Sequence, residues 1–357
     1  MKSNSNKILL FLLTLILITG CSYFSVSGEL NNLNEDSGLK NPKIVEGELK
    51  INIRNIRLLN GTELTGHNKK LGIPEDTQPA LKIWSADINN HSTQKNLSEK
   101  SYSPYPYRFE TEPENGNTIL YYDLSEELTS KDSIIIMRKF RFVSYEYELY
   151  DFNNFDESIR LAEDKHAFFT KSERFLEQGE VLEEVVRSLS LESDSEKPRV
   201  DKIFGWVRDN MEYKYPPEKR GVKNAFATLQ GDCGQYTYLF VTLCRIAGIP
   251  ARSLNGFYFS PDKIGYHVWA EVFLTGYGWI PVDPTDKDGL YKINGHRLIA
   301  SIGNNFKLSG APSWANFNNS EVEDSSTDFM QLATMVISGF DADITTERNI
   351  ISFKEID

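Results

Sequence analysis

The spacing of apolar residues changes near residue 155 and divides the chain into two regions. In the first region apolar and polar positions alternate, as at Leu49, Ile51 and Ile53, and polar clusters such as residues 112–117 separate short apolar runs. Alternation with a period of two, interrupted by turns, is typical of strands with one buried face. The strand-like runs are residues 49–53, 81–84, 118–124, 133–142 and 143–150. Residues 45–155 are therefore predicted to form a β-sandwich domain.

The second region starts with helical spacing. Segments with apolar residues at i, i+3 and i+4 are residues 181–189, 200–211 and 233–247. Gly248 and Pro250 end the third of them. Strand-like segments follow at residues 252–259, 267–273 and 279–282. Helices followed by an antiparallel meander predict an α+β domain over residues 156–310, and residues 311–357 are expected to add C-terminal strands that close the fold.

The N-terminus has the features of an export signal. Lys2 and Lys7 precede an apolar run over residues 8–18 that is too short to span a bilayer. Residues 1–20 are therefore predicted to be a signal peptide, and the polar residues 21–44 a flexible tether. Ile-Thr-Gly before Cys21 resembles a bacterial lipobox. That resemblance implies a lipid on Cys21 and anchoring on the extracytoplasmic face of a bacterial membrane; the alternative is an ordinary signal peptide with an incidental cysteine.

Composition and charge narrow the classes of partner. The chain has 357 residues, of which 40% are hydrophobic and 25% charged, so it has ample material for a globular core. Its formal net charge is −12, and loss of Lys2 and Lys7 with the signal makes it more negative. An acidic protein repels nucleic acid and anionic lipid head groups. We therefore expect no nucleic-acid partner and a membrane contact that depends on the lipid anchor.

Two cysteines remain if Cys21 is acylated, namely Cys233 and Cys244. Both fall on one predicted helix, roughly 16 Å apart along its axis, which is beyond the reach of a disulfide. Both are expected to be free thiols. A free cysteine in an exported protein favours a catalytic role.

Cys233 is the predicted nucleophile. It starts its helix within Gly-Asp-Cys-Gly-Gln, where unpaired backbone N–H groups and the helix dipole lower the pKa of a thiol. The neighbouring Gly234 is expected to let a substrate backbone approach closely. Cys244 lies among apolar residues three turns later and is predicted to be a buried, inert thiol. The alternative for Cys233, a second buried thiol, is disfavoured by its place at the helix start.

His267 and Asp283 are predicted to complete the site. His267 and Trp269 share one face of the strand 267–273, opposite an aliphatic face, and are expected to face the nucleophile helix or the cleft beside it. If residues 274–276 form the hairpin loop, position 273 pairs with 277 and position 267 with 283. Asp283 would then lie opposite His267, unless the register slips by one residue. Trp269 is expected to form a wall of the cleft.

The sequence predicts no cofactor. The other histidines, at positions 67, 91, 166 and 296, have no cysteine partner with motif context and are expected to be structural. None of the five histidines forms a His-x-His or His-Glu-x-x-His pair, which disfavours zinc. The acidic turn at residues 286–289 lacks the ligand spacing of an EF-hand.

Residues 224–286 closely resemble the core of the transglutaminase-like superfamily, whose fold is related to papain-like cysteine proteases. The segments that carry the resemblance are Gly-Asp-Cys-Gly-Gln-Tyr around Cys233, Leu-Cys-Arg-Ile-Ala-Gly-Ile-Pro-Ala-Arg after it, His-Val-Trp-Ala-Glu-Val from His267, and Gly-Trp-Ile-Pro-Val-Asp-Pro-Thr around Asp283. The resemblance implies that Cys233 is the nucleophile, His267 the general acid and base, and Asp283 the residue that orients the imidazole. The strand-rich first region resembles the β-domain of many bacterial members.

These residues predict thioester chemistry on an amide. The Cys233 thiolate attacks a peptide or carboxamide carbonyl, His267 protonates the departing amine, and water or a primary amine resolves the thioester. The Cys233 N–H is the expected oxyanion donor, with Gln230, Tyr213 or Tyr215 as its side-chain partner.

Three functions stay open at this point. The first is hydrolysis by a peptidase or amidase, the second is amine transfer by a true transglutaminase, and the third is a surface protein that only binds peptide or glycan. The complete triad favours an enzyme, and we predict a hydrolase first. A protein or peptide substrate, from the cell envelope on grounds of location alone, is the expected partner.

Overall fold

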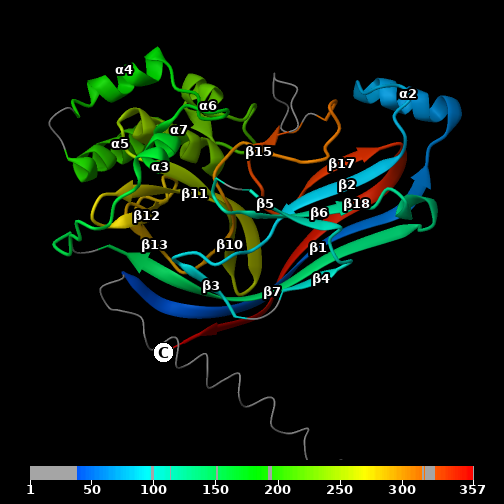
Figure 1. Ribbon diagram of the computed structural model, residues 1–357, viewed down its shortest axis with the longest axis horizontal. Coiled ribbons are helices and arrows are strands. Elements are labelled where there is room, and N and C mark those ends of the chain that lie inside the picture. Colours follow the sequence, from blue (N-terminus) through cyan, green and yellow to red (C-terminus); the bar gives the residue numbers. More distant parts are fainter. Residues whose placement is uncertain are drawn as a thin grey trace, which may run out of the picture.

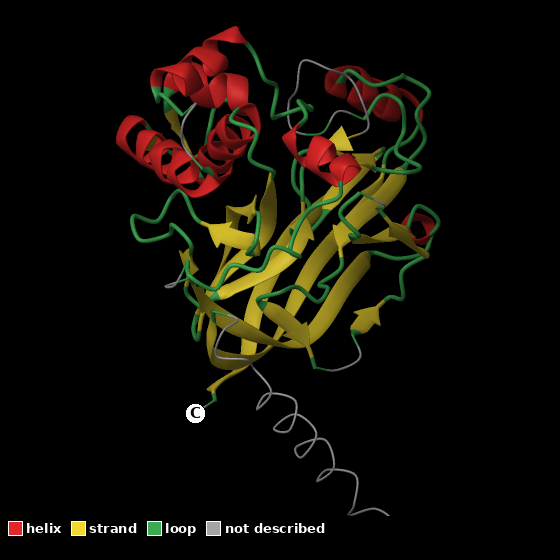
Figure 2. Cartoon of the chain, turned by 60° about the vertical axis from the view of Figure 1, so that its left-hand side comes forward, coloured by secondary structure: helices red, strands yellow, loops and turns green. Residues whose placement is uncertain are grey.

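The computed structural model describes residues 38–97, 100–112, 114–149, 152–191, 195–315, 317 and 326–356. Most helices gather at one end of the molecule, and long twisted strands occupy the rest (Figures 1 and 2). The predicted signal peptide, Cys21 and most of the predicted tether lie outside the described residues. Within these ranges, no helix combines the length and the apolar character needed to cross a membrane.

The β-domain consists of two antiparallel sheets that share one core. The first sheet contains β1 (Leu39–Leu58), β3 (Gln94–Asn96), β4 (Ser101–Ser103), β7 (Ser133–Glu148), β13 (Lys292–Ile293) and β18 (Phe340–Glu355). The second contains, in spatial order, β17 (Thr334–Ser338), β2 (Ala80–Ala86), β6 (Thr118–Asp123) and β5 (Arg108–Thr111). The predicted alternation in β1 is confirmed, because Leu49, Ile51 and Ile53 all point into this core with at most 3% of their surface exposed.

Both ends of the described chain build the first sheet. β1 lies between β7 and β18, so that Ile51 pairs with Ile136 on one side and with Thr346 on the other. β17 likewise adds to β2 in the second sheet. The C-terminal strands therefore complete the β-domain, although almost the whole α+β region separates them from it in sequence (blue and red strands in Figure 1). Strand periodicity identifies a strand but not its partner, so the sequence did not reveal this arrangement.

The predicted tether over residues 21–44 is wrong for its last residues. β1 begins at Leu39, and Lys43 and Ile44 pair with both β7 and β18. Residues 40–43 have a tether-like composition, yet Lys40 pairs with β7 and Lys43 pairs with both β7 and β18. Backbone pairing by neighbouring strands has overridden the local composition here.

The α+β region places a helical layer on a small antiparallel sheet. Its helices are α3 (Glu163–Thr170), α4 (Glu180–Ser188), α5 (Glu196–Asn210), α6 (Val222–Thr228) and α7 (Cys233–Ile246). Its sheet has the order β12 (Gly278–Val282), β11 (Lys263–Leu274), β10 (Ala251–Ser260) and β14 (Arg297–Ile302). α7 is buried almost along its whole length and packs against β10 and β11. The three predicted helices and three predicted strands of this region are all present, and the α+β class is confirmed.

Several short elements carried no usable sequence signal. They are α2 (Gly61–Leu71), the single turn η2 (Glu127–Thr129), β8 (Glu212–Tyr213), β9 (Gln230–Gly231), β15 (Phe306–Lys307) and β16 (Ser326–Thr327), together with α3 and α6 above. In α2 the buried residue is Asn68, whose amide donates to the carbonyls of Glu75 and Thr77. A helix without an apolar stripe cannot be found from hydrophobic periodicity.

Candidate active site

Cys233 is the first residue of α7, as predicted. The Asp232 side chain caps this helix by accepting a hydrogen bond from the backbone N–H of Gln235 at 3.2 Å. Cys233 itself is half-buried and free. Its backbone N–H belongs to the first turn and has no acceptor inside the helix, and the positive end of the helix dipole lies at the same place. A thiolate and an oxyanion would both be stabilised at this position.

Cys244 shows the contrast within one helix. It is fully buried, and this burial raises the pKa of its thiol well above the ordinary value. Both cysteines of the described chain are free, as the helix spacing predicted. Only Cys233 combines access with a helix N-terminus.

His267 and Asp283 form a short, direct contact. Nε2 of the imidazole lies 2.6 Å from Oδ2 of the carboxylate. Because an ionised carboxylate only accepts hydrogen bonds, Nε2 carries the donated proton. Nδ1 is then the ring nitrogen left for the thiol, and Cys233 does interact with this imidazole through a side-chain hydrogen bond and through charge. The carboxylate fixes one nitrogen and leaves the other for chemistry.

Asp283 is a firmly held anion. Besides His267, Nη2 of Arg297 donates to its Oδ2 at 2.6 Å, and Thr285 donates to its Oδ1 from the backbone at 3.0 Å and from the hydroxyl at 2.6 Å. Burial alone would raise the pKa of this carboxyl, but the charges and hydrogen bonds of His267 and Arg297 hold the pKa well below its usual range. Arg297 lies on β14, and no sequence motif pointed to it.

The same contacts control the imidazole. Burial lowers the pKa of His267, but the Asp283 carboxylate and the Cys233 side chain outweigh burial and raise the pKa to about 9. The ring is therefore protonated at neutral pH. The protonated ring is a proton donor next to Cys233.

The structure overturns two predicted cleft residues. Trp269 is fully buried and stacks on His267, with ring centroids 5.6 Å apart and an interplanar angle of 17°. Gly234 is also buried, and a Cβ there would lie 2.7 Å from the Phe329 ring and 3.0 Å from the Arg220 guanidinium. Phe329 and Arg220, which lie outside the sequence motifs, cover Gly234. Trp269 packs against one face of the His267 ring and does not line a cleft.

The predicted hairpin register is wrong, yet the predicted pair forms. The loop is residues 275–277, so Phe273 pairs with Trp279 and not with residue 277. This moves the partner of each β11 residue by two positions, which keeps every side chain on its predicted face. Asp283 directly follows β12 and therefore lies diagonally across from His267 in β11. Side chains on such a diagonal can reach each other. An error of one residue would have separated the two groups.

Among the predicted oxyanion partners, Tyr213 is placed best. β8, which contains Tyr213, pairs with β9 just before Cys233. Burial and the charge of Cys233 raise the pKa of Tyr213, so its phenol lies within electrostatic reach of the thiol. The Gln230 amide donates to Glu212 at 3.0 Å, which uses one of its two N–H donors. Tyr213 is 59% exposed and Tyr215 is 74% exposed.

A polar pocket adjoins the imidazole. It has a volume of about 500 Å³ and reaches both His267 and Asp283. The remaining lining residues are Arg208, Tyr258, Thr285, Asp286, Lys287, Asn294 and Arg297. Charged and hydrogen-bonding groups predominate, so the pocket suits water and polar parts of a substrate.

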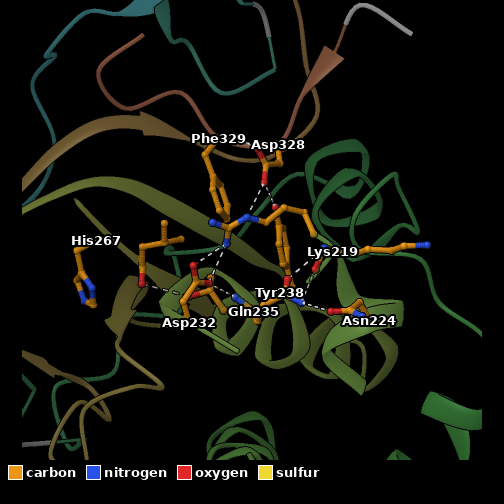
Figure 3. Close-up of polar contacts among 12 residues, drawn as sticks. Lys219, Asn224, Asp232, Gln235, Tyr238, His267, Asp328 and Phe329 are labelled. Carbon is orange, nitrogen blue, oxygen red and sulfur yellow. Dashed lines mark hydrogen bonds and ion pairs between the residues drawn. The ribbon is translucent and has the colours of Figure 1, made fainter. Parts of the chain in front are cut away.

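A second polar group surrounds the start of α7, and no sequence motif indicated it. Nη1 of Arg220 lies 2.8 Å from both carboxylate oxygens of Asp232. Asp328 accepts a hydrogen bond from the Tyr238 hydroxyl at 2.8 Å, and Phe329 lies beside it over the helix (Figure 3). Asp328 and Phe329 are about 90 residues away from this helix in sequence, so local patterns could not link them to Cys233.

Comparison with known proteins matches residues 183–284 to the transglutaminase-like superfamily. Kyphoscoliosis peptidase of Mus musculus is 29% identical over 126 residues, which cover 30% of this chain and 18% of that protein. The uncharacterized protein YebA of Bacillus subtilis strain 168 is 25% identical over 143 residues, or 33% of this chain and 19% of that protein. The chain thus spans about a fifth of the length of these two relatives.

A solved structure shares the fold over most of the chain. It is a proposed cysteine protease from Cytophaga hutchinsonii, with a TM-score of 0.54 and 14% sequence identity over 88% of this chain and 92% of that one. The shared fold therefore extends well beyond residues 183–284 and includes much of the β-domain.

Proposed function

The chain is a member of the transglutaminase-like superfamily through residues 183–284, and from this premise we propose that it is a thiol hydrolase that cleaves amide bonds through Cys233, His267 and Asp283. The observation that carries the proposal is the ring orientation of His267. Nε2 is bound to Asp283 at 2.6 Å, so Nδ1 is available to exchange a proton between Cys233 and the substrate.

In the first half-reaction the Cys233 thiolate attacks the amide carbonyl carbon, and the carbonyl π electrons move to oxygen. The tetrahedral intermediate collapses when Nδ1–H of the His267 imidazolium donates its proton to the amide nitrogen. The C–N bond breaks, the amine leaves, and a thioester joins Cys233 to the acyl group. Asp283 stays ionised throughout and holds the ring in place.

In the second half-reaction water attacks the thioester. Neutral His267 now accepts a proton from this water at Nδ1, and collapse of the second intermediate releases a carboxylic acid and the Cys233 thiolate. The imidazolium and thiolate pair is thereby restored. Every proton that leaves Nδ1 in the first half returns to it in the second.

The negative oxygen of both intermediates needs two donors. The backbone N–H of Cys233 supplies one, since it has no acceptor within α7. The Tyr213 hydroxyl is the preferred second donor, for the placement described above. Donors of this kind typically contribute about 2.7–4 kcal/mol each to a transition state.

Hydrolysis is our first proposal, because water needs no binding site of its own. The polar pocket with Arg208, Lys287 and Asn294 in its lining lies against His267 and Asp283 and does not include Cys233, so it does not rank the two outcomes. Transfer to an amine uses the same residues and is the second outcome that the test below distinguishes. A binding role without catalysis would give neither product.

We also propose a place for this reaction. The export signal and the lipobox resemblance at Cys21 favour a lipid anchor on the extracytoplasmic face of a bacterial membrane. Proteins or peptides of the cell envelope are then the accessible substrates. Globomycin-sensitive processing, or labelling of the protein with an alkynyl fatty acid that is lost in Cys21→Ala, would test the anchor.

The catalytic proposal is tested by acylation of the purified protein with an activated ester, p-nitrophenyl acetate. Rapid quench and mass spectrometry should find an acetyl thioester on Cys233, whereas Cys244→Ser should acylate like the wild type and Cys233→Ser should not acylate. Labelled cadaverine then separates the two fates of the thioester. Release of acetate in its presence supports hydrolysis, and acetyl-cadaverine as the main product supports transfer.

The proposal fails if Cys244 acylates faster than Cys233, or if neither cysteine reacts faster than a thiol in a denatured control. Iodoacetamide provides an independent check that needs no substrate. Alkylation at neutral pH should be fast, should map to Cys233 and should slow in His267→Ala.

A further inference from the structure

The segment Asp328–Gln331 reaches the reactive centre from outside the region that carries the sequence motifs. It follows β16 and leads directly into β17 of the β-domain. Its backbone is held in place where the Ser301 hydroxyl donates to the Met330 carbonyl at 2.6 Å. We call these four residues the C-terminal clamp. One end of the clamp contacts residues next to Cys233 in α7, and the other end contacts the backbone of His267.

One end of the clamp packs against the first turns of α7. Phe329 stacks on Tyr238 with ring centroids 5.1 Å apart at 11°, and its ring closes over Gly234, the residue after Cys233. Asp328 is almost fully buried and accepts the Tyr238 hydroxyl. Figure 3 shows Asp328 and Phe329 above Tyr238 and Asp232. The first turn of α7 therefore cannot move outward without displacing the clamp.

A guanidinium ties the clamp to the helix cap. Arg220 lies against Asp232 at 2.8 Å and has its Nε 3.8 Å from Asp328 Oδ2. It also lies over the Phe329 ring, 5.7 Å from the centroid. One cation thus joins the N-cap of α7 to the clamp. The position of the Cys233 backbone depends on both carboxylates.

The other end of the clamp holds the strand that carries the imidazole. Nε2 of Gln331 donates to the backbone carbonyl of His267 at 2.9 Å and to that of Gly256 at 2.8 Å. Gly256 is the β10 partner of His267, so Gln331 bridges the two strands at this pair. On the other side of β10, a Cβ at Gly256 would lie 1.9 Å from the carbonyl oxygen of Leu298 in β14, so these two strands approach closely here.

We propose that the C-terminal clamp sets the separation between Cys233 and His267, and that Phe329 and Gln331 are positioning residues for the reaction. The clamp is one short stretch of backbone, so a fixed distance between its two ends fixes the distance between the helix start and the strand. Neither residue touches the reacting atoms. The inference rests on the proposed assignment of Cys233 and His267 as the reacting pair.

Geometry explains why such a clamp matters. Proton transfer requires the two heavy atoms to stay within hydrogen-bond distance, and a displacement of about 1 Å can reduce a rate by about 100-fold. α7 and β11 already pack together. The clamp adds a crosslink beside Cys233 at the start of α7 and beside His267 within β11. It also connects the centre to the β-domain, because β17 begins three residues after Gln331.

The test is the pH profile of Cys233 alkylation by iodoacetamide. Gln331→Met keeps the length of the side chain but removes its amide donor, so the His267 carbonyl loses its anchor. We expect the rate at neutral pH, which reports the thiolate and imidazolium pair, to fall between about 10- and 100-fold. Well above the pKa of a free thiol the rate should match the wild type within about twofold, since every thiol is then ionised.

Ser338→Ala is the matched control. Ser338 is also buried, also belongs to the C-terminal segment, and also donates to a backbone carbonyl, that of Gln78 at 3.0 Å, but it lies in β17 away from the centre. Its alkylation profile should overlay that of the wild type even if its thermal stability falls as much as that of Gln331→Met. Phe329→Leu tests the end of the clamp that packs on α7. Its alkylation profile decides the question if Gln331→Met does not fold.

The inference is overturned if the folded Gln331→Met or Phe329→Leu profile overlays the wild-type profile, or if Ser338→Ala changes the neutral rate equally. A different result would instead contradict the proposed function. If the wild type and His267→Ala already share one profile, then Cys233 and His267 are not a reacting pair, whatever the clamp does.

Discussion

At the scale of single residues, the centre depends on a carboxylate with more partners than the motif implies. Asp283 receives donors from His267, Arg297 and Thr285. This arrangement keeps the carboxyl ionised and, through it, keeps His267 protonated at neutral pH. The sequence supplied the two members of the pair, and the structure added the arginine that stabilises the anion.

Asp283→Asn should shift the pH dependence of acylation. In the wild type the rate should fall as pH rises through about 9, because His267 then loses the proton that the leaving amine needs. Removal of the carboxylate leaves burial as the dominant influence, which lowers the pKa of His267. The descending limb should therefore move to lower pH, measured with a peptide amide, whose leaving amine needs this proton. A limb that stays in place would show that another group controls it.

Stability should follow the same two ionisations. The pKa of His267 is raised from 6.5 to about 9 on folding, so its stabilising contribution is complete below about 6.5 and is lost as pH rises through about 9. The pKa of Asp283 is lowered, so its contribution is present above 3.8 and is lost in more acidic solution. Urea unfolding should show the wild type losing stability between pH 6.5 and 9.5. Asp283→Asn should lose less over this interval, and an equal loss would contradict the assignment.

At the scale of elements, the first turn of α7 is the decisive structure. Asp232 caps the helix, pairs with Arg220, and so links the nucleophile to the C-terminal clamp. Gly231 and Gly234 flank this turn because Gln235 and Phe329 fill the space that side chains would need. The glycines were expected to serve the substrate, but they serve packing.

Asp232→Ala should destabilise the protein by roughly 2–4 kcal/mol. Loss of the cap costs about 1 kcal/mol, and the rest comes from leaving the Arg220 guanidinium without its close partner. Asp232→Asn keeps a capping oxygen and should cost less. Ser195→Ala is the matched control, because Ser195 is the N-cap of α5 without a side-chain cap bond, and its cost should stay within about 0.5 kcal/mol. Equal costs for Asp232→Ala and Ser195→Ala in urea unfolding would contradict this reading.

Helices and strands with strong periodicity were predictable, and their pairings were not. α4, α5 and α7 follow the apolar spacing, and β10 to β12 follow the alternation. The register between β11 and β12 was predicted two positions away from the observed one, because the three-residue loop lies one residue later in the chain than predicted. The face of each side chain was still right, since it depends only on parity.

At the scale of the whole molecule, the β-domain is not an independent N-terminal unit. Its central strand β1 lies between β7 and β18, and β17 completes its second sheet. A fragment of residues 38–155 should therefore remain largely unfolded or aggregate, because β1 and β2 would each expose an unpaired edge. Residues 38–357 should fold cooperatively. Circular dichroism and analytical ultracentrifugation of the two fragments would check this, and a folded monomeric 38–155 fragment would refute it.

The sequence by itself singled out the proposed reacting groups of this protein. Cys233, His267 and Asp283 stand in local motifs whose chemistry follows from residue type and position, and Cys244 could be set aside because burial follows from apolar neighbours. The α+β class followed from periodicity in the same way. Such features depend on neighbours in the chain, which the sequence displays directly.

Only the tertiary structure decided what surrounds these groups. Arg297 against Asp283, Gln331 against His267, and β18 beside β1 are contacts between segments far apart in sequence. Polar residues of this kind lack periodicity, and their partners are chosen by where the packed elements bring them. The proposed nucleophile could therefore be found from the chain alone, whereas the residues packed around it became visible only in the folded molecule.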